Sequence, residues 1–154
     1  MHQGPLISNQ EGHTKVHVRL VKDQDGYPSD DWESLWAREV EPGVYLIDNV
    51  PFFARGISCG DLVSATDEGE GLVFGHVITP SRNSVIRVIV FEKEATAGLR
   101  EELRKMGCES ELCDIPGFFS LEIPGTVNAG PVRKFLDAKE TSGVLEYEEA
   151  SIRH

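Results

Sequence analysis

The chain has 154 residues, 40% of them hydrophobic, and its 26 acidic and 15 basic residues give a net charge of −11. A chain of this size can bury a core without disulfides or metals, as one large domain or two small ones. Its negative field disfavours nucleic acids and membrane surfaces and favours a peptide or protein partner with basic segments, unless the charge serves solubility alone.

The cysteines and the N-terminal residues point to a cytoplasmic protein. Three cysteines are an odd number and do not suggest a disulfide framework. Residues 1–14 lack the basic and apolar regions of a signal peptide, and no apolar run is long enough to span a bilayer. We expect residues 1–14 to form a disordered tail because they are polar and rich in Gly, Asn and Gln.

Residues 15–80 have the pattern of short strands separated by turns. Residues 16–20 alternate apolar and polar side chains, as a strand with one buried face does. Residues 32–40 are ambiguous: Trp32, Leu35 and Trp36 have helical spacing, but an irregular strand also fits. Further strands are predicted at 37–50, as a hairpin around a Pro-Gly turn, and at 61–63 and 72–78. This pattern predicts a small, β-rich, barrel-like module.

Residues 84–152 show a different order of elements. The segment 84–91 is almost continuously apolar and β-branched, as in a central strand. A helix is predicted at 94–106, ended by Gly107, and a second one after an N-cap at Asn128. With a hairpin at 110–123 and a last strand at 144–152, the order is β-α-β-β-α-β, which is ferredoxin-like. The predicted fold class is therefore α+β, and the sheet face opposite the helices would need a cover.

Three segments resemble an uncharacterised bacterial family, a domain of unknown function. They are WESLWA at 32–37, VYLIDNVPFFARGISCGDLV at 44–63 and SRNSVIRVIV at 81–90. The resemblance covers roughly residues 15–150 and implies a shared fold without an activity. The chain also looks, more distantly, like accessory proteins of ribosomal peptide natural-product pathways, some of which bind a precursor peptide.

Two adjacent aromatic residues, Phe52 and Phe53, are the most informative candidates for a binding site. Neighbouring side chains on an extended segment point in opposite directions, so one core cannot easily take both. With Arg55 and Trp36 they could form a recognition pocket, because aromatic residues and arginine dominate binding hot spots. The competing interpretation is a hydrophobic plug between the two modules.

A second candidate is a small basic cluster that includes Arg82 and Arg87. These side chains could accept a carboxylate or a phosphate. Internal salt bridging is the interpretation that we favour for them.

Catalytic and metal sites have little support in the sequence. Cys59 could act as a nucleophile with His76 as its base and Asp61 to orient the base, but the apolar neighbours of His76 suggest a histidine satisfied in the core. No spacing matches a zinc site or a phosphate-binding loop, and we expect no cofactor and no metal.

These observations favour a non-enzymatic peptide- or protein-binding accessory factor. The alternative is an acidic inhibitor or immunity-type protein that covers a basic surface of a nuclease or an RNA-binding regulator. An enzyme that uses Cys59 and His76 is a third hypothesis. A homodimer stays open, because an edge strand at 144–152 would need protection.

Overall fold

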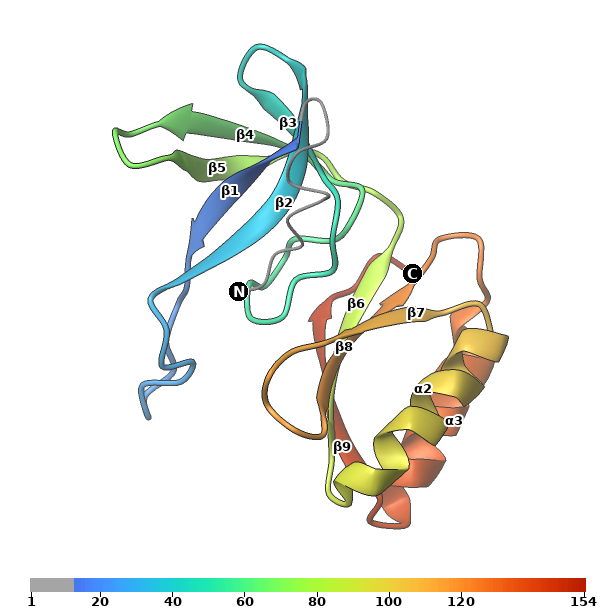
Figure 1. The fold of residues 1–154 in the computed structure, drawn as a ribbon. Coiled ribbons are helices and arrows are strands. Elements are labelled where there is room, and N and C mark those ends of the chain that lie inside the picture. Colours follow the sequence, from blue (N-terminus) through green and yellow to red (C-terminus); the bar gives the residue numbers. More distant parts are fainter. Residues whose placement is uncertain (1–12) are drawn as a thin grey trace. The chain divides into compact units, whose positions relative to one another are not determined.

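The structure is a computed structural model that describes residues 13–154. The fold is mixed α+β: five strands close into a barrel, and four strands form a sheet that carries two α-helices. The chain divides into two compact units, Met1–Ser81 and Arg82–His154, which we call unit 1 and unit 2. Both are drawn in Figure 1. Each unit has its own hydrophobic core.

Unit 1 is the barrel. Its strands pair in sequence order, each antiparallel to the next, and β1 closes the barrel by pairing parallel with β5. Closure matters because a closed barrel offers no exposed strand edge to a partner. The strands are β1 (His13–Arg19), β2 (Trp32–Glu41), β3 (Val44–Ile47), β4 (Leu62–Asp67) and β5 (Leu72–Thr79).

Alternation along β1 and β2 fills the barrel. Val16 and Val18 of β1 and Leu35 and Ala37 of β2 point into the core, where each is at most 6% exposed. Burying a valine or leucine side chain contributes about 1.5–3 kcal/mol.

Of the two interpretations that the sequence left open for residues 32–40, the strand is correct and the helix is not, because Leu35 and Ala37 set a period of two. Side chains four residues apart share a face in a strand as well as in a helix, so Trp32 and Trp36 fitted both. The predicted hairpin of residues 37–50 is confirmed: Ala37 pairs with Ile47. Gly43 makes its turn with a φ of +81°, a conformation that favours glycine.

Unit 2 has the element order β-α-β-β-α-β that the sequence predicts. Its antiparallel sheet has the strand order β7-β8-β6-β9. Figure 1 shows both helices against the same face of this sheet. The elements are β6 (Ser84–Val90), a 3₁₀ turn η1 (Lys93–Ala95), α2 (Thr96–Lys105), β7 (Glu109–Leu112), β8 (Phe118–Ile123), α3 (Ala129–Thr141) and β9 (Leu145–Ser151).

The predicted helix ends of unit 2 are confirmed. Asn128 is the N-cap of α3, and its side chain accepts a hydrogen bond from the backbone N–H of Gly130 at 3.0 Å. Gly107 follows α2 with a φ of +96°, as a residue just past a helix C-terminus often does. Leu99 and Leu103 of α2 pack with Leu136 of α3 in the core of unit 2. None of the helices in residues 13–154 is long and apolar enough to cross a membrane.

The predicted disordered tail of residues 1–14 falls mainly on residues 1–12, which lie outside the described residues. For its last two residues it is wrong. His13 and Thr14 belong to β1, where they pair with Arg38 and Ala37 of β2.

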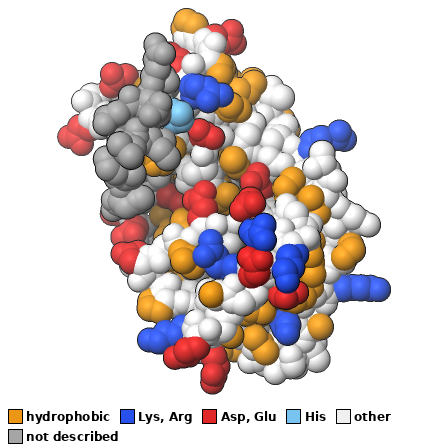
Figure 2. Space-filling view, turned by 45° about the vertical axis from the view of Figure 1, so that its right-hand side comes forward, with side chains coloured by type: hydrophobic (Ala, Val, Ile, Leu, Met, Phe, Trp, Pro, Cys, Tyr) orange, Lys and Arg blue, Asp and Glu red, His pale blue; other side chains and the backbone are white. Residues whose placement is uncertain are grey.

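The boundary between the units distributes the charge unevenly. Unit 1 has 13 acidic and 5 basic residues, a formal charge of −8, whereas unit 2 has 13 acidic and 10 basic residues, a charge of −3. On the face that Figure 2 presents, acidic, basic and hydrophobic side chains are interspersed. The negative field that the sequence predicts therefore belongs mostly to the barrel.

Candidate functional site

The loop that carries Phe52 and Phe53 is held by one carboxylate. Glu33 of β2 accepts three backbone hydrogen bonds, from the N–H groups of Phe52 at 2.7 Å, Phe53 at 2.9 Å and Ala54 at 2.8 Å. Ionised acceptors make stronger hydrogen bonds than neutral ones, so this carboxylate fixes the path of the loop. Ala54 is buried in the barrel core.

The two phenylalanines have different surroundings in unit 1. Phe53 is partly buried, packs against the barrel core and meets the ring of Tyr27 edge to face, with 6.1 Å between the ring centroids. Phe52 is also partly buried, with its ring centroid 6.5 Å from that of Phe53, but it is not a member of the barrel core cluster. Arg55 is exposed. Within the barrel, therefore, Phe53 has the packing of a core residue.

Trp36 belongs to a different surface, the outer face of β1 and β2. Antiparallel register places Arg19 opposite Trp32, His17 opposite Ser34, and Lys15 opposite Trp36. We call these six residues the β1–β2 face. The Arg19 guanidinium lies 4.4 Å from the centroid of the Trp32 ring, and Lys15 Nζ lies 4.7 Å from that of Trp36. Between these two pairs, His17 Nδ1 and Ser34 Oγ form a hydrogen bond of 2.7 Å.

The β1–β2 face is a local concentration of positive charge in an acidic unit. Lys15 and Arg19 are two of the five basic residues of unit 1. Arg38, a third, continues the row opposite His13. The nearby acid Asp48 is engaged, since its carboxylate lies 2.8 Å from His13 Nε2. Trp32 is 40% exposed, so the face presents an accessible aromatic ring among these cations.

The cluster around Arg82 and Arg87 is largely occupied by contacts within unit 2. Arg87 is 4% exposed and its Nε lies 2.8 Å from a carboxylate oxygen of Glu148. Asn83 accepts a hydrogen bond from Gly125, and Ser84 accepts one from the backbone of Arg153. Arg82 is exposed. These contacts agree with internal pairing of Arg87, the interpretation that we favoured.

Cys59, Asp61 and His76 do not form a triad. Asp61 is buried and accepts hydrogen bonds from the backbone of Ser58 at 2.8 Å and of Ser81 at 2.7 Å. His76 is exposed on β5 and bonds through Nδ1 to Ser64 Oγ at 3.0 Å. The expectation that His76 lies in the core was wrong. Phe74 and Val77 both pack against the barrel core, and the register of β5 against β4 shifts between them. This irregularity breaks the alternation that would otherwise place His76 on the same face as Phe74. Among residues 13–154 no group of His, Cys, Asp and Glu could hold a metal ion.

Sequence reasoning found Trp36 but missed its companions Trp32, Lys15 and Arg19. The information was present as alternation: basic side chains occupy every second position of 15–19, and Trp, Ser and Trp occupy every second position of 32–36. Recognising the face required the register between the strands, which residue spacing within one strand does not give.

The fold defines a two-unit α+β protein, a barrel followed by a sheet with two helices. The chain belongs to the family described as a domain of unknown function, DUF4265, which matches residues 33–147. No curated protein matches this chain. A solved structure, a hypothetical protein from Neisseria gonorrhoeae, is 24% identical with a TM-score of 0.74, covering 93% of this chain and 97% of its own. That likeness shows a shared fold.

Proposed function

We propose that the protein is a non-enzymatic binding module that docks an extended peptide segment of a partner on the β1–β2 face. The observation that carries the proposal is the pairing of Trp32 with Arg19 and of Trp36 with Lys15 across two neighbouring strands. Tryptophan and arginine are the residues that most often dominate binding interfaces. Because the barrel is closed, a partner would contact these side chains and would not add a strand.

The local charge favours a partner segment with acidic residues. The expectation of a basic partner rested on the net charge of −11, whereas the charged side chains of this face, Lys15 and Arg19, are cationic. Carboxylates of a short peptide could reach Lys15 and Arg19 while an apolar side chain covers Trp32. A nucleic acid fits less well, because its repeated phosphates would meet the −8 charge of unit 1. A precursor peptide with an acidic stretch is one partner of this kind.

Two finer assignments accompany this proposal. We assign unit 2 to the ferredoxin-like class, supported by its element order and its strand order β7-β8-β6-β9. We place the protein in the cytoplasm, where cysteines are kept reduced; Cys59, Cys108 and Cys113 all have the form of thiols.

Selection from a random 12-residue peptide library tests the proposal. The wild-type protein is compared with K15Q/R19Q, and K134Q serves as a control for the loss of an exposed cation in unit 2. We expect wild-type and K134Q to enrich the same peptides, rich in Asp, Glu and apolar residues, and K15Q/R19Q to bind them at least about tenfold more weakly. Circular dichroism verifies that each variant is folded.

Intrinsic fluorescence locates the binding, since both tryptophans of the chain lie on this face. An enriched peptide should change the emission of W36F and of W32F, each of which keeps one reporter. Enrichment of basic peptides would instead favour the acidic-inhibitor alternative. A preference for single-stranded oligonucleotides over peptides, or equal enrichment by K15Q/R19Q, would contradict the proposal.

A further inference from the structure

Unit 2 contains an open pocket of about 470 Å³ between the start of α2 and the loop that joins β7 to β8. Lys93, Thr96 and Arg100 line it from the helical side, and Leu112, Ile115 and Pro116 line it from the loop. This pocket shares no residue with the β1–β2 face, because every residue that lines it belongs to unit 2. Its volume lies within the range of small-molecule sites.

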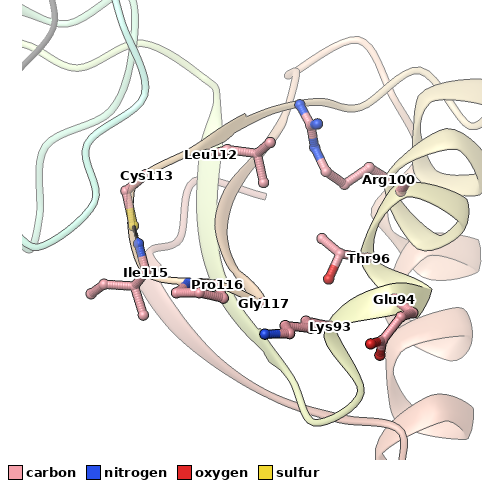
Figure 3. Close-up of a pocket in the computed structure, with 10 residues that line it drawn as sticks. Lys93, Glu94, Thr96, Arg100, Leu112, Cys113, Ile115, Pro116 and Gly117 are labelled. Carbon is pink, nitrogen blue, oxygen red and sulfur yellow. Dashed lines mark hydrogen bonds between the residues drawn. The ribbon is translucent and has the colours of Figure 1, made fainter.

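The helical side of the pocket is polar and positively charged. Lys93, Thr96 and Arg100 are spaced three and four residues apart, so a helix places them on one face. Figure 3 shows Thr96 between Arg100 and Lys93. The Arg100 side chain extends toward β7, where it contacts Ser110. Glu94 also lines the pocket, and in this view its carboxylate lies to the right of Lys93, on the side away from the loop.

Thr96 gives the clearest sign of a binding site. It is 8% exposed, and its Oγ1 atom has no hydrogen-bond partner among residues 13–154. A buried hydroxyl without a partner costs free energy, so most such groups in proteins are satisfied. Its neighbour Arg100 is held in place by Ser110, which accepts hydrogen bonds from Nε at 2.7 Å and Nη2 at 2.9 Å. Lys93 forms no ion pair with the described residues.

The start of the helix adds to the attraction for an anion. Neither η1 nor α2 has a side-chain cap at its N-terminus. The backbone N–H groups of a first turn carry partial positive charge and are a common place for anions to bind. A carboxylate here could accept a hydrogen bond from the Thr96 hydroxyl and pair with Lys93.

The opposite wall of the pocket is apolar and open. Leu112 is 53% exposed and Ile115 is 48% exposed. Large apolar side chains that are exposed beside a polar pocket suit a ligand with an apolar body. The occupant should therefore combine one negative charge with a hydrophobic group.

We propose that this pocket binds a carboxylate that is attached directly to a small apolar group. Thr96 donates a hydrogen bond to the carboxylate, Lys93 and Arg100 supply the positive charge, and Leu112, Ile115 and Pro116 contact the apolar part. The same chemistry occurs in a free arylalkanoic acid and in the C-terminal residue of a peptide that ends in a hydrophobic side chain.

Titrations followed by ¹H–¹⁵N NMR test this site. The probes are 3-phenylpropionate and its uncharged amide, 3-phenylpropanamide, together with a peptide ending in leucine as the free acid and as the C-terminal amide. We expect at least one of the two free acids to shift the amide signals of residues 93–100 and 112–117 saturably, and neither amide to do so. Which acid binds more tightly identifies the source of the carboxylate.

Variants separate a specific site from general attraction. T96V and K93Q should each weaken binding of the free acid by about tenfold. T96S should retain binding, and K105Q, which removes a cation at the far end of α2, should leave it unchanged. The unliganded spectrum of each variant verifies its fold. Equal binding of acids and amides, no loss in T96V, shifts elsewhere in the chain, or no saturable shifts would each overturn the proposal.

Discussion

Glu33 lies between two tryptophans in the sequence, yet its role is to organise a loop 19 to 21 residues further along the chain. Its carboxylate accepts the N–H groups of three successive residues, Phe52, Phe53 and Ala54. Without an acceptor, these donors would be only partly compensated by water, because the loop packs against the barrel core. One side chain thus determines the conformation of the segment that sequence analysis singled out.

The substitution E33A should lower the free energy of unfolding by about 3 kcal/mol, since three charge-assisted hydrogen bonds are lost. E33Q keeps one acceptor oxygen and should cost less, about 1–2 kcal/mol. Urea unfolding measures both. E41A, which removes an exposed carboxylate from the same strand, should change stability by less than about 0.5 kcal/mol. Equal effects of E33A and E41A would contradict this role.

Cys108 makes the stability of unit 2 sensitive to alkaline pH. It is 1% exposed in the core, and burial raises the pKa of its thiol to about 11, with Glu122 and Glu109 contributing. The folded protein therefore keeps this proton at a pH where the unfolded chain has lost it. Stability due to this group is complete below about pH 9 and decreases as the pH rises toward 11.

We expect the free energy of unfolding to fall by about 2–3 kcal/mol between pH 9 and pH 11. C108A should show a smaller fall, although its cavity lowers stability at every pH. Tyr147 adds a later decrease, because its hydrogen bond to Asp137 raises the pKa of its phenol to about 12. Chemical denaturation at several pH values measures these slopes. Parallel curves for C108A and the wild-type protein would exclude Cys108 as the cause.

At the scale of elements, the two aromatic rings in the loop of residues 48–61 have different surroundings. Phe53 belongs to the residues that pack on the barrel core, and Tyr27 covers its edge. F53A should therefore cost about 3 kcal/mol of stability. F52A should cost less. If Phe52 contributes to binding, F52A should also weaken the binding of the selected peptides by about 2 kcal/mol.

Thermal melts and peptide titrations of the two variants distinguish these roles. A large loss of stability in F52A together with none in F53A would reverse the assignment. Unchanged stability and binding in both variants would make the segment an ordinary surface loop.

Elements defined by local chemistry could be predicted from the sequence, and those defined by tertiary contacts could not. Asn128 marks a helix start because its side chain accepts a backbone N–H of the first turn. Gly107 marks a helix end because its positive φ suits glycine. The segment at 32–36 was ambiguous because the two tryptophans share a face under either period. The sequence did not indicate the pocket lined by Thr96, because that pocket depends on the β7–β8 loop lying opposite the helix.

At the scale of the whole molecule, the family match extends from β2 of unit 1 into β9 of unit 2. The family is therefore defined by both units. Each unit nevertheless has a separate core made of its own residues. Two separate cores can unfold at different temperatures, in which case one melting temperature does not describe the chain.

Two spectroscopic probes can distinguish the units, because both tryptophans lie in unit 1 and both α-helices in unit 2. We expect E33A to lower the midpoint of the tryptophan transition more than that of helical circular dichroism. N128A removes the N-cap of α3 at a cost of about 1 kcal/mol and should do the reverse. N128D, which restores a capping side chain, is the control. Equal shifts of both midpoints in each variant would show one cooperative transition.

The chain passes from unit 1 to unit 2 only once, at Ser81 and Arg82, and this order affects how the protein is made. A ribosome completes every strand of the barrel before it begins β6, so the barrel can assemble while the remaining residues are still being synthesised. Asp61 then accepts the N–H group of Ser81, which ties the last residue of the barrel to a finished structure. The nascent chain would thus have its more acidic half folded, and soluble, before the apolar strand β6 emerges.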